Sequence, residues 1–138
     1  MAEKEWTQFL REGTRTAKLS VNLPSGRPTV TPVWFLYEDG VIRVETGADS
    51  PKARALAADP RACLIVDLEK SPYAFVKIDA TAAIIDDPDL TLRVATDIGG
   101  RYMGPDRAEE FGARNGGPGQ ITIEFTPTRV TAIHDISD

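Results

Sequence analysis

The chain has 138 residues, of which 41% are hydrophobic and 27% are charged, a balance typical of a folded domain rather than a disordered segment. Its formal net charge of -5 disfavours broad binding to nucleic acid or to an anionic membrane surface. The length suits one domain, residues 1–138, with one core. We therefore expect a large cofactor to lie on the surface or between two copies of the chain.

The first half of the chain combines strands with two short helices. A helix is expected over residues 3–12, where three large apolar residues share one side. Apolar and polar residues then alternate, which predicts half-buried strands joined by tight turns. These strands cover residues 17–23, 29–37 and 41–46. The second helix begins with Ser50 as its cap and Pro51 in its first position, and it ends at Asp59-Pro60.

The second half contains longer strands and the longest helix. Large apolar residues recur every four positions and predict one helix stripe, at Leu90, Val94, Ile98 and Tyr102. A further short helix is expected around Phe111. The remaining strands cover residues 62–68, 73–85, 121–125 and 130–136. Strands outnumber helices, so the predicted fold class is mainly β with short helices, an antiparallel barrel rather than a βαβ sheet.

Residue counts exclude several kinds of site. Cys63 is the only cysteine and lies in an apolar run, where we expect a small buried hydrophobe and no disulfide. His134 is the only histidine, which excludes a histidine metal cluster or a histidine-based triad. Arg101 reads as a surface arginine, with an anion contact as the alternative. We see no signal peptide and no membrane-spanning run, so we expect a cytoplasmic protein.

Positive charge gathers at the expected start of the second helix, in Asp49-Ser50-Pro51-Lys52-Ala53-Arg54. A helix start offers free backbone N–H groups and a partial positive charge. Lys52 and Arg54 add full charges that oppose the helix dipole, and a bound phosphate would reverse that penalty. The pattern fits a phosphate site, and it fits a solvated basic turn equally well.

A proline interrupts the strand expected over residues 29–37, in Thr31-Pro32-Val33-Trp34-Phe35. Pro32 has no backbone N–H, so the strand must have an edge, a bulge or a non-protein neighbour near its middle. A planar heterocycle lying along such an edge would use the remaining N–H and C=O groups. The alternative, which local reasoning favours, is a bulged core strand with Trp34 packed inside.

Seven short segments follow one another along the chain: Gly13-Thr14-Arg15-Thr16-Ala17, Gly26-Arg27-Pro28, Thr31-Pro32-Val33-Trp34-Phe35, Ser50-Pro51-Lys52-Ala53-Arg54, Asp59-Pro60-Arg61, Tyr73-Ala74-Phe75-Val76 and Arg101-Tyr102-Met103-Gly104. In this order they resemble the pyridoxamine-phosphate-oxidase-like split-barrel proteins, in particular the actinobacterial branch that uses the deazaflavin coenzyme F420. The resemblance spans nearly the whole chain. The longer basic phosphate motif and the C-terminal substrate residues of the pyridoxamine-phosphate oxidases themselves are missing, which argues against that substrate.

The resemblance implies a six-stranded split β-barrel that forms a homodimer, with a cofactor in each of two clefts at the dimer interface. The ring system would lie along the interrupted strand, and the phosphate would lie at the basic helix start. The residues that match the family's cofactor site are Thr31, Pro32, Val33 and Trp34 for the ring, Ser50, Lys52 and Arg54 for the phosphate, and Tyr73 and Phe75 near the cofactor. Tyr73 and Phe75 would come from the same subunit or from its partner.

The resemblance also implies an F420H2-dependent reductase, which passes a hydride to an electron-poor small-molecule substrate. FMN is the alternative cofactor, because both molecules carry a ring, a ribityl chain and a phosphate. F420 adds an oligoglutamate tail that would favour further basic residues such as Arg27 or Arg61. A third alternative is a module that binds the cofactor, or another planar ligand such as a tetrapyrrole, without turnover. Solvent or Tyr73 would supply the proton.

Overall fold

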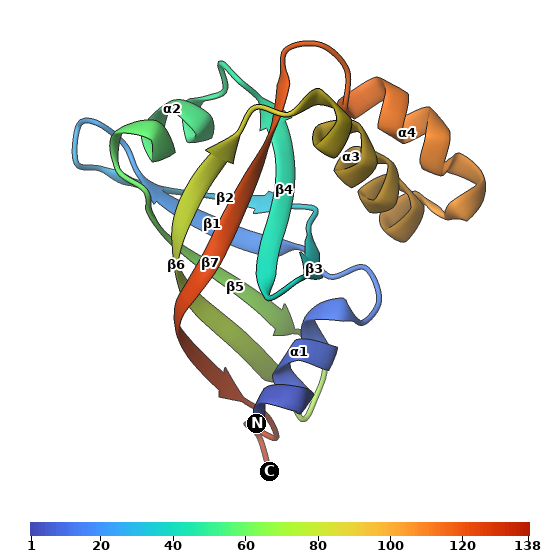
Figure 1. The fold of residues 1–138 in the computed structure, drawn as a ribbon. Coiled ribbons are helices and arrows are strands. Elements are labelled where there is room, and N and C mark those ends of the chain that lie inside the picture. The colour runs from blue at the N-terminus through green and yellow to red at the C-terminus, as the bar shows by residue number, and fades with distance from the viewer.

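The computed structural model describes residues 1–138 and consists of a seven-stranded sheet flanked by short helices (Figure 1). The strands are β1 (Ala17–Asn22), β2 (Pro28–Val33), β3 (Leu36–Glu38), β4 (Val41–Gly47), β5 (Arg61–Leu68), β6 (Ala74–Ile85) and β7 (Gln120–Ile133). The helices are α1 (Glu3–Arg11), α2 (Pro51–Ala58), α3 (Pro88–Met103) and α4 (Ala108–Asn115), with a 3-10 turn over Pro105–Arg107. None of the helices combines the length and apolar character that crossing a bilayer requires.

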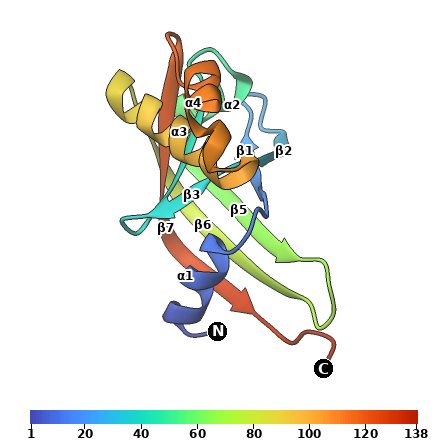
Figure 2. The same ribbon diagram turned by 90° about the vertical axis from the view of Figure 1, so that its right-hand side faces the viewer.

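The sheet closes into a split barrel. Its strand order is β2-β1-β5-β6-β7-β4-β3, and all neighbouring strands are antiparallel. The two edge strands, β2 and β3, are separated in the chain only by Trp34 and Phe35. The sheet must therefore curl until its edges meet at one corner, as Figures 1 and 2 show. The mainly β, antiparallel split-barrel fold is confirmed.

The inner face of the curled sheet forms the core. Side chains that lie opposite one another on neighbouring strands share a face of the sheet. On the inner face these partners are apolar and buried, as in the row Leu19, Leu64 and Ile78. The helix α2 covers one end of the barrel, whereas both chain termini lie at the other end (Figure 1).

Two strand boundaries differ from the sequence-based expectation. The segment 29–37 forms two strands because Trp34 leaves the sheet and stacks on Tyr102 of α3, with ring centroids 5.0 Å apart. The expected strands 121–125 and 130–136 form one continuous strand, β7. Its partner register shifts at Asp79/Ala80, which leaves Thr128 as an unpaired bulge residue whose hydroxyl donates to the Asp79 carbonyl at 3.0 Å.

A second layer, α3 with α4, lies on the outer face of the sheet beside β4 and β7 (Figure 2). The hydroxyls of Thr91 on α3 and Thr122 on β7 form a buried hydrogen bond of 2.8 Å. The two helices approach closely at Gly99, where an added Cβ would lie 2.6 Å from the Phe111 Cβ. Glycine is therefore required at this contact.

Arg101 joins this layer to the rest of the barrel. Its guanidinium donates to the carbonyls of Phe35 at 2.7 Å, Leu10 at 2.9 Å and Gly13 at 3.0 Å. Burial lowers its pKa, with the nearby Tyr102 acting in the opposite direction. Arg101 is therefore neither an anion contact nor a free surface arginine, because its donors bond to backbone carbonyls.

We expect Arg101→Met to reduce the free energy of unfolding by about 2–4 kcal/mol, because carbonyls on three segments, two of them partly buried, would lose their donor. Arg114 on α4 is exposed and has no hydrogen bond or ion pair, so Arg114→Met is the matched control and should change stability by less than about 0.5 kcal/mol. Urea unfolding of both variants measures the difference. Equal stabilities would contradict a joining role for Arg101.

Candidate cofactor site

The start of α2 is built around the Ser50 hydroxyl. This oxygen accepts the backbone N–H of Ala53 at 3.2 Å and the hydroxyl of Thr46, at the end of β4, at 3.1 Å. Its own hydrogen remains free to donate. The backbone N–H of Lys52 has no partner within the protein. The expected cap is confirmed, and the helix start retains donors for an anion.

The two basic side chains of this helix start differ in their surroundings. Lys52 is half-buried, whereas Arg54 is exposed on the outer side of the helix. Neither forms an ion pair. Lys52 therefore presents a charge without an ion-pair partner at the helix start, and Arg54 adds an exposed charge at the rim.

Lys52 lines a cavity of about 320 Å³ between α2 and the β1–β2 hairpin. The lining residues are Leu19, Val21, Leu23, Thr29, Thr31, Pro51 and Lys52. Thr31 and Leu19 are cross-strand partners, so both side chains face the same side of the hairpin. The cavity thus has apolar walls, two threonine hydroxyls and one cationic end, which suits an amphipathic ligand with an anionic group.

The interrupted strand places Thr31 and Val33 on its inner face, Pro32 on its outer face and Trp34 beyond its end. Thr31 faces the cavity, Val33 is buried in the core, and Pro32 is exposed on the edge strand β2, which pairs only with β1. Trp34 is half-buried outside the sheet, stacked on Tyr102 with an interplanar angle of 2°. Pro32 therefore reflects an edge strand, and Trp34 is not packed inside the core.

Tyr73 and Phe75 lie at the start of β6, which is at the opposite end of the molecule from α2 and near the chain termini (Figure 1). They line a separate groove of about 610 Å³ that also contains Ile65, Leu68 and Ile136. Tyr73 is 45% exposed and has a positive φ of 63°, a conformation that is unfavourable for an aromatic residue. Within one chain these two residues do not meet Thr31 or Lys52.

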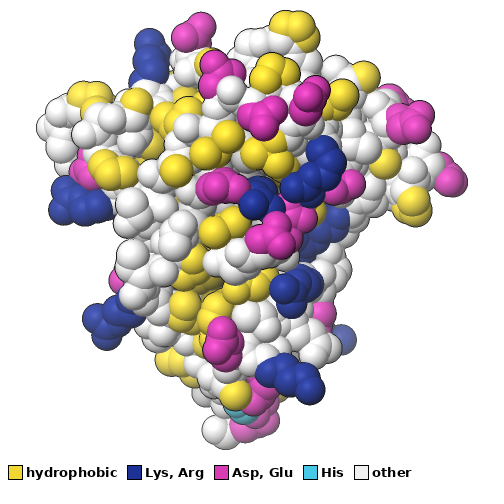
Figure 3. All heavy atoms as spheres, in the orientation of Figure 1, with side chains coloured by type: hydrophobic (Ala, Val, Ile, Leu, Met, Phe, Trp, Pro, Cys, Tyr) yellow, Lys and Arg dark blue, Asp and Glu magenta, His cyan; other side chains and the backbone are white.

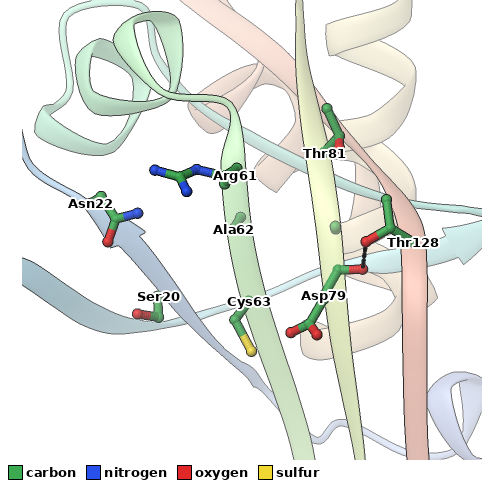
Figure 4. Close-up of a pocket in the computed structure, with 9 residues that line it drawn as sticks. Ser20, Asn22, Arg61, Ala62, Cys63, Asp79, Thr81 and Thr128 are labelled. Carbon is green, nitrogen blue, oxygen red and sulfur yellow. Dashed lines mark hydrogen bonds between the residues drawn. The ribbon is translucent and has the colours of Figure 1, made fainter.

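A polar groove of about 360 Å³ crosses the outer face of β1, β5 and β6 (Figure 4). Cys63 lies in it beside Asp79 rather than in the core, so the expectation of a buried cysteine is wrong. Burial raises the pKa of the Cys63 thiol, and the nearby Asp79 carboxylate raises it further. Arg61 is engaged by Asp59 through contacts of 3.0 and 2.8 Å. The groove therefore holds no reactive thiolate and no free arginine.

Glu45, on β4, is a feature that the sequence analysis missed. Its side chain is half-buried and has no hydrogen bond or ion pair. Burial raises its pKa to about 7, and the positive charge of Lys52 acts against that rise. The only feature of the sequence that could have singled out Glu45 is its place just before the basic helix start. Its burial depends on how β4 packs in the fold, which the sequence does not show locally.

The sequence and the fold are similar to those of known proteins. Residues 2–134 match the family model described as pyridoxamine 5'-phosphate oxidase. No curated protein matches the chain in sequence. A solved structure of the conserved hypothetical protein Rv2991 from Mycobacterium tuberculosis is 26% identical, with a TM-score of 0.87, covering 99% of this chain and 87% of that one.

Two further solved structures share the fold at lower identity. An F420 reductase is 24% identical with a TM-score of 0.73, covering 90% of this chain and 94% of that one. HutZ, the heme storage protein from Vibrio cholerae, is 17% identical with a TM-score of 0.74, covering 99% of this chain and 98% of that one. With the family model spanning almost the entire sequence, the chain belongs to the pyridoxamine 5'-phosphate oxidase family of split-barrel proteins.

Proposed function

We propose that this protein is an F420H2-dependent reductase that acts as a homodimer on an electron-poor small molecule. One observation carries the proposal: Thr31, from the strand expected to hold the ring, and Lys52, from the helix expected to hold the phosphate, line the same cavity. The ring and phosphate of one cofactor are the groups that such a pair would bind.

The phosphate would bind at the start of α2. The free N–H of Lys52 and the unused hydrogen of the Ser50 hydroxyl are neutral donors there, and the Lys52 ammonium adds charge. The helix dipole favours an anion at the same place. Arg54, exposed at the rim, would add a weaker and more screened attraction.

The ring would lie along the edge of β2. This strand has no neighbour on its outer side, so its backbone groups are free to pair with a heterocycle. Val33 would contribute its backbone only, since its side chain lies in the core. Trp34 would close one side, held in place by its stack on Tyr102. The reduced deazaflavin supplies a hydride when bound, and the protein positions it and excludes water.

F420 is favoured over FMN by the chain-wide resemblance and by the basic residues near the cavity. An F420 reductase is among the proteins that share the fold. Arg27, in the β1–β2 turn, is exposed and forms no ion pair, so it is available to an anionic tail. Arg61 is already paired with Asp59, which makes it the weaker tail contact.

A second subunit would complete the site. Tyr73 and Phe75 line a mainly apolar groove remote from Lys52, so they reach a cofactor only if another copy of the chain supplies them. An open groove bordered by Ile136 is also a surface that a partner subunit would cover.

The cofactor is tested by mass spectrometry of the ligand released from protein made in a host that synthesises F420. We expect F420. Release of FMN would assign the alternative flavin chemistry to the same site. A Soret-like absorbance band would instead favour tetrapyrrole binding, because the heme storage protein HutZ has the same fold.

Lys52→Ala should weaken F420 binding about tenfold to a hundredfold, because a charge-assisted hydrogen bond to phosphate contributes about 1.5–3 kcal/mol. Stability without cofactor should change by less than about 0.5 kcal/mol. The exposed Lys70, in the β5–β6 loop, provides the matched control, and Lys70→Ala should bind like wild type. Fluorescence titration measures all three proteins. Equal affinities would mean that the helix start is only a solvated turn.

Phe75→Glu should shift the protein towards monomer at micromolar concentration and weaken F420 binding, because a charge would be buried in the proposed subunit contact. Leu92 on α3 is 47% exposed on another surface, so Leu92→Glu should remain dimeric. Analytical ultracentrifugation with and without F420 distinguishes these outcomes. A monomeric wild type that still binds F420 would refute the dimeric site.

A further inference from the structure

The turn between β1 and β2 fixes the direction in which the backbone groups of β2 point. The N–H of Leu23 donates to the carbonyl of Arg27 at 2.9 Å, so these two opposite residues form a hydrogen-bonded pair. In an antiparallel ladder such pairs alternate with pairs that exchange no bond. The register of the two strands therefore directs the backbone groups of Thr29 and Thr31 towards β1.

The residues between them, Pro28, Val30 and Pro32, turn their backbone groups to the free edge of β2. The prolines agree with this direction, because proline in a sheet occupies positions whose N–H would face away from the ladder. Neither proline has an N–H, so along residues 28–32 the edge carries one donor, the N–H of Val30, beside the carbonyl of the same residue. Neither group of Val30 has a partner within the protein.

This edge is a poor template for another β-strand. Strand addition needs a row of donors and acceptors, and the two prolines leave only one such pair, at Val30. The edge therefore suits a ligand that offers one acceptor next to one donor in the same plane. A cyclic amide or imide has this arrangement, because its carbonyl and its N–H are adjacent.

Val30 also borders the cationic cavity. Its neighbours on either side, Thr29 and Thr31, line the cavity that contains Lys52. Successive residues of a strand are only about 3.3 Å apart, so the free pair at Val30 lies along the margin of that cavity. The side chain of Val30 is 64% exposed on the opposite face of the strand, where it takes no part in the cavity wall.

Charged side chains around β4, by contrast, are matched by opposite charges. Arg43 of β4 pairs with Glu38 of β3 at 2.8 Å and with Glu124 of β7 at 2.7 Å. Figure 3 shows acidic and basic side chains interspersed over this face. Lys52 has no ion-pair partner, so the cavity beside Val30 favours a ligand that also carries an anionic group.

We propose, on the basis of the cofactor site described above, that the backbone of Val30 recognises the pyrimidine edge of the cofactor ring. In flavins and deazaflavins this edge is an imide, with an N–H between two carbonyls. One imide oxygen accepts the N–H of Val30, and the imide N–H donates to the carbonyl of Val30. The ring continues along residues 31–34, and Lys52 holds the phosphate. Heme has no imide edge, so this pair selects a flavin-type ring.

Amide hydrogen exchange of the wild type, followed by NMR, tests the pair directly. Without ligand, the N–H of Val30 should exchange at least about a hundredfold faster than those of Thr29 and Thr31, which are bonded within the ladder. Saturating F420, or FMN if FMN is the cofactor, should slow exchange at Val30 at least about tenfold. Inorganic phosphate, which has no ring, should leave Val30 in fast exchange.

A pair of variants separates the N–H of Val30 from its side chain. Val30→Pro removes the N–H without breaking a ladder bond, whereas Val30→Ala shortens the side chain and keeps the N–H. Val30→Pro should weaken binding of F420, and of a deazariboflavin that lacks the phosphate, about tenfold each, and Val30→Ala should weaken both by less than about twofold. Lys52→Ala should weaken binding of F420 alone.

Equal affinities of Val30→Pro and Val30→Ala for F420, or fast exchange at Val30 in the complex, would overturn the role of Val30 while leaving the cofactor site intact. The exchange measurement needs no variant, so it decides the proposal even if Val30→Pro fails to fold. Failure of the wild type to bind F420 or FMN would overturn both the role of Val30 and the cofactor site.

Discussion

The hydroxyl pair between Thr46 and Ser50 fixes the start of α2 on the end of β4, and the candidate site depends on that fixed position. It sets where the free N–H and ammonium of Lys52 lie relative to the β1–β2 hairpin. A single junction between strand and helix thus determines where the site offers its positive charge and free donors to an anion.

Much of the fold follows from local sequence signals. Alternation at a period of two predicts the strands, and Ser50-Pro51 predicts the start of α2, because both signals act over a few residues. The errors arise where distant residues decide. Trp34 leaves the sheet because Tyr102, far along the chain, stacks on it. Proline is typical of turns, so Pro127 favoured a break between residues 125 and 130. A bulge at Thr128 accommodates the irregularity and keeps β7 continuous.

Part of the candidate site was also predictable from local sequence signals. The helix start and the edge strand carry local signals, and the structure brings Thr31 and Lys52 into one cavity. The pKa of Glu45 depends on burial between elements, which no short motif encodes. Arg101 has a backbone-binding role for the same reason, since its acceptors come from α1, the following loop and the β2–β3 corner. Tyr73 and Phe75 lie apart from Lys52 within one chain, so only contact with a second chain would bring them to the cofactor.

A crystal structure of the protein with F420 would test the location of the cofactor most directly. The expected result places a phosphate oxygen within hydrogen-bonding distance of the Lys52 backbone N–H, with the ring along residues 31–34. A phosphate found in the polar groove beside Cys63 and Asp79, or at the Tyr73 groove with no contact to α2 of either subunit, would contradict the assignment of this helix start as the anion site.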